Sequence, residues 1–134
     1  MIFDISNIED LDSCDVFYHG DTLAGLFFDR TKKTLRLTIS KWHTEKSTEI
    51  RFQDVIGFRI STCGFWREDE HIFALRYIEP DNERILPDLL KRKEKYPVYP
   101  LKEKEAYFET ALKFVSGDEL VVACKQVALE RYAY

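Results

Sequence analysis

A regular alternation of apolar and polar side chains is the feature that most constrains the fold of this chain. Between residues 34 and 41 every second side chain is apolar, namely Leu35, Leu37 and Ile39. The same spacing returns at Ile56, Phe58 and Ile60. Neighbouring side chains of a β-strand point to opposite faces, so a period of two predicts strands with one buried face. The stretch from Tyr18 to Ile60 therefore predicts four consecutive antiparallel strands.

The rest of the chain extends this pattern to seven predicted strands. These are Thr22–Phe28, Thr34–Lys41, Ser47–Phe52, Val55–Thr62, His71–Ile78, Glu105–Phe114 and Glu119–Val127. The fifth would place Phe73, Leu75 and Tyr77 on one face. Leucines at helical spacing predict one short helix over Pro87–Lys95, and Met1–Cys14 is expected to be a short helix or a packed irregular segment.

Together these elements predict a mainly β (α+β) fold within a single domain, residues 1–134. The short connections favour antiparallel pairing, so we expect one antiparallel sheet of about seven strands with one short inserted helix. That sheet could be curled or sandwich-like, and a half-open barrel is the close alternative. A chain of this length buries enough apolar surface to fold without a metal or a disulfide.

Composition narrows the functional classes. The chain is 45% apolar and 33% charged, as in ordinary globular proteins, and it lacks both a membrane-spanning apolar run and a secretion signal. We therefore expect a cytoplasmic protein with no membrane partner. Cys14, Cys63 and Cys124 form neither an even set nor a close pair, which predicts reduced thiols rather than disulfides or a zinc knuckle.

Charge is distributed unevenly along the chain. Residues 1–30 contain only one base, Arg30, and seven acids: Asp4, Glu9, Asp10, Asp12, Asp15, Asp21 and Asp29. Such an acidic segment repels nucleic-acid phosphates and attracts a basic partner, although acids also serve plain solubility. We take Asp12 and Asp15 as candidate binding residues.

The tripeptide His19-Gly20-Asp21 is the first candidate for chemistry. In an extended chain its imidazole and carboxylate lie on the same side and could share a metal ion or a proton. A metal would need a further ligand from His43 or His71. The alternative is a turn in which Asp21 accepts backbone N–H bonds, and on that basis we predict no metal and no cofactor.

Aromatic side chains supply the second set of candidates. Phe65 and Trp66 follow the fourth predicted strand and Trp42 ends the second. Aromatic residues at such positions either cover the core or, if exposed, anchor a partner. Cys63 beside Gly64 could act as a nucleophile, but no histidine that could activate it lies nearer in sequence than His71.

The first half of the chain also resembles a known group of proteins. The run Tyr18-His19-Gly20-Asp21-Thr22-Leu23, the strand end Phe28-Asp29-Arg30 and the segment from Ile50 to Val55 are similar to small bacterial domains that open with an aromatic-His-Asp element, some of them immunity proteins of polymorphic toxin systems. The inserted Gly20 departs from that pattern. Ser61–Trp66 and Phe114–Asp118 resemble uncharacterised proteins of Gram-positive bacteria.

Two functions of different classes follow. The first is a non-enzymatic interaction protein, in which an acidic segment attracts a basic toxin and Phe65 and Trp66 anchor it. The second is a small-ligand or metal-dependent enzyme built around His19 and Asp21. We favour the first, and free strand edges could also pair two copies of the chain.

Overall fold

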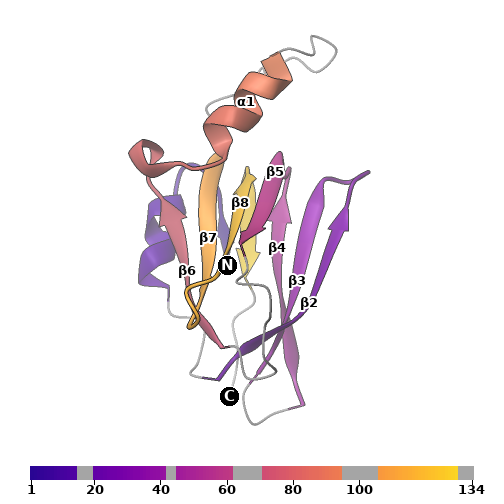
Figure 1. The fold of residues 1–134 in the computed structure, drawn as a ribbon. Coiled ribbons are helices and arrows are strands. Elements are labelled where there is room, and N and C mark those ends of the chain that lie inside the picture. The colour runs from indigo at the N-terminus through magenta and orange to yellow at the C-terminus, as the bar shows by residue number, and fades with distance from the viewer. Residues whose placement is uncertain (15–19, 42–44, 62–70, 95–105, 130–134) are drawn as a thin grey trace.

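The structure, a computed structural model, describes residues 1–14, 20–41, 45–61, 71–94 and 106–129. Within these ranges the chain forms two antiparallel sheets that face one another (Figure 1). The first sheet has the order β1 (Ile2–Phe3), β9 (Gln126–Leu129), β4 (Ser47–Gln53), β3 (Thr34–Ser40) and β2 (Thr22–Asp29). The second has the order β5 (Gly57–Ser61), β8 (Glu119–Cys124), β7 (Phe108–Phe114) and β6 (Ile72–Ile78).

Helical segments are short. A 3₁₀ helix, η1 (Ile8–Ser13), packs beside β6, and a second, η2 (Pro80–Asn82), follows that strand. The single α-helix of the described residues, α1 (Leu86–Glu94), confirms the predicted helix from Pro87 to Glu94 and begins one residue earlier; Lys95 lies outside the described residues. No helix in these parts of the chain has the length and apolar character needed to span a membrane.

A mainly β antiparallel fold is confirmed, but the prediction of a single sheet is wrong. Two strands bend and pass from one sheet to the other. The pair Gln53 and Gln126 belongs to the first sheet and the pair Gly57 and Ala123 to the second. Between these pairs, residues 54–56 lie opposite residues 124–125, so one strand carries an extra residue, as in a β-bulge.

Backbone hydrogen bonds continue through this bend. The N–H of Lys125 donates to Gln53 O at 3.1 Å, and the N–H of Ile56 donates to Ala123 O at 2.9 Å. Asp54 adopts a left-handed conformation with φ 54°, which increases the local turn. Consequently the predicted fourth strand leaves the first sheet, and the predicted strand Glu119–Val127 is divided between β8 and β9.

A second link joins the two sheets at the edge strands β2 and β6. Thr22 and His71 form an isolated bridge, and the N–H of Ile72 donates to Asp21 O at 2.8 Å. The fold thus combines features of both expected shapes, a face-to-face sandwich and a half-open barrel.

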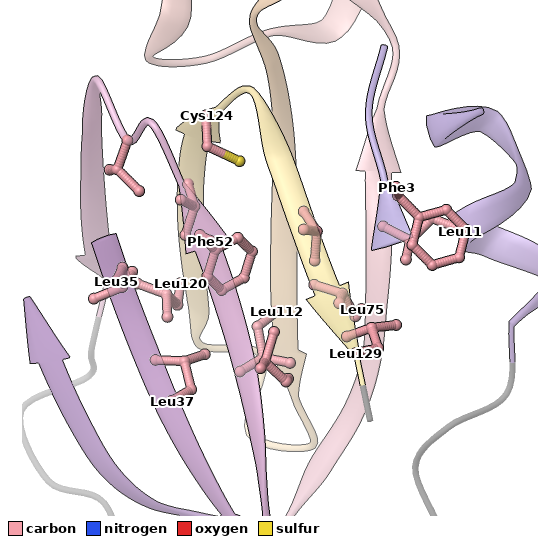
Figure 2. Close-up of a cluster of buried hydrophobic side chains, with 14 of the residues drawn as sticks. Phe3, Leu11, Leu35, Leu37, Phe52, Leu75, Leu112, Leu120, Cys124 and Leu129 are labelled. Carbon is pink, nitrogen blue, oxygen red and sulfur yellow. The ribbon is translucent and has the colours of Figure 1, made fainter. Parts of the chain in front are cut away.

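The main core lies between the sheets (Figure 2). The alternating residues Leu35, Leu37 and Ile39 are fully buried there, as the period of two predicts. Phe52, Leu112 and Leu120 fill the space opposite and beside them. Each side chain of this size contributes about 2 kcal/mol by leaving water.

A smaller apolar cluster lies on the outer face of the second sheet, under α1. It contains Ile78, Ile85, Leu86, Ala111, Val121 and Ala123. Because α1 covers this region, β7 and β8 are buried on both faces. One side chain departs from its predicted face, since an irregularity between Ile72 and Ala74 leaves Phe73 69% exposed while Leu75 is buried.

Candidate functional site

Asp21, a candidate from the sequence, forms a buried ion pair. It directly precedes the cross-strand pair Thr22 and Ser40, so it lies opposite Lys41. Lys41 Nζ donates to Asp21 Oδ2 at 2.5 Å, and the two side chains are 1% and 0% exposed. Gly20, with φ 99°, turns the chain into this position, where glycine is favoured.

Two opposing effects act on the pKa of Lys41 in this pair. Burial lowers the pKa of the Lys41 ammonium, while the hydrogen bond and the negative charge of Asp21 raise it. Desolvation disfavours the charged form of a buried lysine, and a nearby carboxylate favours it. The Asp21 carboxylate, which the sequence suggested as a metal ligand, therefore accepts a hydrogen bond from the Lys41 ammonium group instead.

Of the three histidine candidates, the structure describes only His71. The bridge between Thr22 and His71 brings half-buried His71 beside the segment that carries Asp21. His19 and His43 lie outside the described residues. Within the described ranges, no group of three or more His, Cys, Asp or Glu side chains is arranged to hold a metal ion.

Asp12, the second candidate from the sequence, is held on η1. Ile8 and Leu11 of η1 are each 1% exposed and anchor the helix in the main core. This places Asp12 Oδ1 at 2.8 Å from the backbone nitrogen of Tyr77, whose N–H it accepts. Because β6 is an edge strand, the carboxylate replaces the hydrogen bond that a neighbouring strand would supply.

Four carboxylates surround Tyr77, and we call them the acidic face: Glu9, Asp12, Glu79 and Glu83. Burial raises the pKa of the Tyr77 hydroxyl, and the charges of Glu83, Glu9 and Glu79 raise it further. Burial also raises the pKa of Glu83, with a second contribution from the charge of Glu109. Acids of the N-terminal segment thus lie close to Glu79 and Glu83, which flank η2.

A cavity of about 480 Å³ adjoins the acidic face. Its lining includes Asp12, Tyr77 and Glu79 and also the bases Arg76, Arg84 and Lys113. A second cavity of about 320 Å³ lies between α1 and β5, and its charged lining residues are Arg59, Arg84, Arg92 and Asp88. Acids therefore cluster around Tyr77, while the two cavities are lined by both acids and bases.

Sequence reasoning missed Glu109, which fixes the start of α1. This carboxylate is fully buried and accepts the backbone N–H groups of Arg84, Ile85 and Leu86 at 2.8, 2.8 and 2.7 Å. The first N–H groups of a helix lack partners within the helix, and an anion there is favourable. Arg84 also forms an ion pair with Glu119.

Two of the three cysteines, Cys14 and Cys124, lie within the described residues. Cys124 is buried, and burial raises the pKa of its thiol, so the nucleophilic thiolate is suppressed there. Cys14 is a half-buried free thiol. Cys63 and the candidate binding residues Asp15, Trp42, Phe65 and Trp66 lie outside the described residues.

Comparison of the chain with models of known protein families, with curated proteins and with solved structures gives no match. The resemblance to immunity proteins accordingly stays a prediction.

Proposed function

We propose that this chain is a non-enzymatic protein-interaction module, an antidote of the immunity type, that works in the cytoplasm and binds a basic toxin. The observation that supports this proposal is the acidic face around Tyr77. There, Glu9 and Asp12 from the N-terminal segment lie beside Glu79 and Glu83 from a distant part of the sequence.

The acidic face is suited to attract a basic protein. Opposite charges on two proteins accelerate their encounter and fix their relative orientation. The buried side chains of Ile8 and Leu11 hold η1 in place, so binding costs little ordering of this segment. Tyr77 is half-buried against the main core and lies among these charges, and tyrosine is enriched among binding hot spots.

The proposal also retains the aromatic and acidic candidates from the sequence. Phe65, Trp66 and Trp42 would supply apolar contacts to the partner, and Asp15 would add to the attraction. We expect Trp66→Ala to weaken the complex by about 2 kcal/mol, as for a hot-spot tryptophan.

Affinity capture from the source organism, followed by mass spectrometry, would identify the partner. Association rates with the purified partner would then be measured for the double variant Glu9→Lys/Glu79→Lys at several salt concentrations. The matched control is Glu45→Lys, which makes a charge reversal at an exposed residue of the β3–β4 loop.

We expect the double variant to associate at least about tenfold more slowly than the wild type, with a weaker dependence on salt. The control should stay close to the wild type. A captured partner without a basic surface, or equal association rates for the two variants, would overturn the proposal.

A further inference from the structure

Three of the four edge strands in the described parts of the chain are protected against pairing with another chain. β1 has only two residues. The edge of β6 is covered by η1, where Asp12 accepts the Tyr77 N–H. β5 carries the exposed Arg59 and lies next to α1, with Gly57 packed beneath Leu89. Short edges, charges and covering helices are the usual means of blocking edge pairing.

β2, the fourth edge strand, is long and has no described helix packed along its edge, and its register is irregular only between Leu23 and Gly25. It has eight residues and reads TLAGLFFD, without a charged side chain from Thr22 to Phe28. Leu26 is 37% exposed and Phe27 is 53% exposed. Apart from the bridge at Thr22, no described strand pairs with the outer edge of β2. Among the described residues, the outer edge of β2 beyond Thr22 is therefore not paired with another strand, and it lies beside exposed apolar side chains.

We infer that β2 pairs with β2 of a second copy of this chain. The two strands would run antiparallel about a two-fold axis and join two five-stranded sheets into one continuous sheet of ten strands (5 + 5). Because β2 carries no charged side chain from Thr22 to Phe28, two copies paired over this part of the strand bring no like charges on β2 together. Pairing would also cover part of the exposed surface of Leu26 and Phe27.

This interface does not depend on the proposed function. In Figure 1, β2 approaches β6 only at the end where Thr22 bridges His71, and the rest of β2 runs on the opposite side of the fold from β6 and η1, which carry part of the acidic face. A dimer formed through β2 therefore leaves the acidic face accessible, and the two proposals can fail separately.

The first test is the mass of the purified full chain by sedimentation velocity, from about 1 µM to about 200 µM, because dimerisation follows mass action. We compare the wild type with Phe27→Lys, which places a charge on the free edge. The matched control is Phe73→Lys, which changes an aromatic residue that is 69% exposed on β6. Circular dichroism and melting temperature establish that each variant is folded.

We expect a concentration-dependent dimer for the wild type and for Phe73→Lys. The dissociation constant of the dimer should be at least about tenfold larger for Phe27→Lys, since an edge lysine opposes pairing. Hydrogen exchange should show slower exchange of the amides of residues 23–28 as the wild-type concentration rises, and no such change in Phe27→Lys. A monomer throughout the range would overturn the inference. So would a dimer in which these amides stay unprotected, or β2 protection that appears only with a foreign partner.

Discussion

Lys41 Nζ lies 2.5 Å from Asp21 Oδ2 at the end of the β2–β3 hairpin, and both side chains are sealed from solvent. Lys41 continues the column of inward side chains formed by Leu35, Leu37 and Ile39, so its ammonium group is directed into the sandwich. A buried charge without a partner is strongly unfavourable. Asp21 is therefore the group that permits a lysine at this position.

Replacement of Asp21 by asparagine should destabilise the fold by about 3–5 kcal/mol, because the buried Lys41 ammonium loses the carboxylate beside it. Urea denaturation would measure the loss. The control Glu49→Gln breaks the exposed pair with Arg51 and should cost less than about 1 kcal/mol. The apolar pair Asp21→Leu/Lys41→Met should be more stable than Asp21→Asn alone. Equal losses in Asp21→Asn and Glu49→Gln would contradict this account.

The pKa of Lys41 should fall further in Asp21→Asn, because Asp21 supplies the two effects that raise it. In the window between that lowered pKa and 10.5, the unfolded chain binds more protons at Lys41 than the folded chain. The free energy of unfolding of the variant should then rise with pH through this window. Titration of the Lys41 side chain by NMR, with denaturation at matching pH values, checks both statements. A higher Lys41 pKa in the variant would refute them.

Glu109→Gln should destabilise the chain by about 2–3 kcal/mol, because the carboxylate accepts three backbone N–H groups and an amide can accept from only one of its two ends. Hydrogen exchange should show that amides of α1 open more readily. Glu119→Gln is the matched control, since it weakens only an exposed ion pair with Arg84 and should cost under about 1 kcal/mol. Unchanged exchange of α1 in Glu109→Gln would show that another group fixes the helix.

The local pattern was sufficient to predict most strands, but not their assignment to two sheets. Inward residues of β8 are even-numbered up to Cys124, and those of β9 are odd-numbered from Val127. This change of phase marks the bend. The sequence does not reveal this change of phase, because Val121 and Ala123 on the outer face are also apolar. They are apolar because α1 covers that face.

The candidate acids were found from the sequence, but their partners were not. Asp21 pairs with a lysine 20 residues away, and Asp12 binds a backbone amide 65 residues away. Such contacts depend on strand register and on the docking of η1, which local patterns do not encode. Glu79 and Glu83 were not among the candidate residues, because their proximity to Glu9 arises only in the folded chain.

Glu83→Gln should stabilise the chain at neutral pH and have little effect in acid. The pKa of Glu83 is raised from 4.5 by burial and by the charge of Glu109. In the window above 4.5 and up to that raised pKa, the folded chain holds the proton more tightly than the unfolded chain, so wild-type stability falls as pH rises. Denaturation across this window should show that the free energy of unfolding of the variant, relative to that of the wild type, increases with pH. A constant difference would contradict the raised pKa.

Gly57→Ala should disturb the packing of α1 on β5. A Cβ at residue 57 would lie 2.6 Å from Cδ1 and 2.9 Å from Cδ2 of Leu89, closer than atoms can approach. Overpacking typically costs 1–3 kcal/mol, but the atoms that must move are the terminal methyl groups of half-buried Leu89, so we expect a loss of about 1 kcal/mol in urea denaturation. In the double variant Gly57→Ala/Leu89→Ala the clash is absent, so adding Gly57→Ala to Leu89→Ala should cost far less than adding it to the wild type. Gly25→Ala is the matched control, since its Cβ would meet only Thr38 at 3.8 Å. Additive losses in the Gly57 and Leu89 cycle would show that this contact does not set the position of α1.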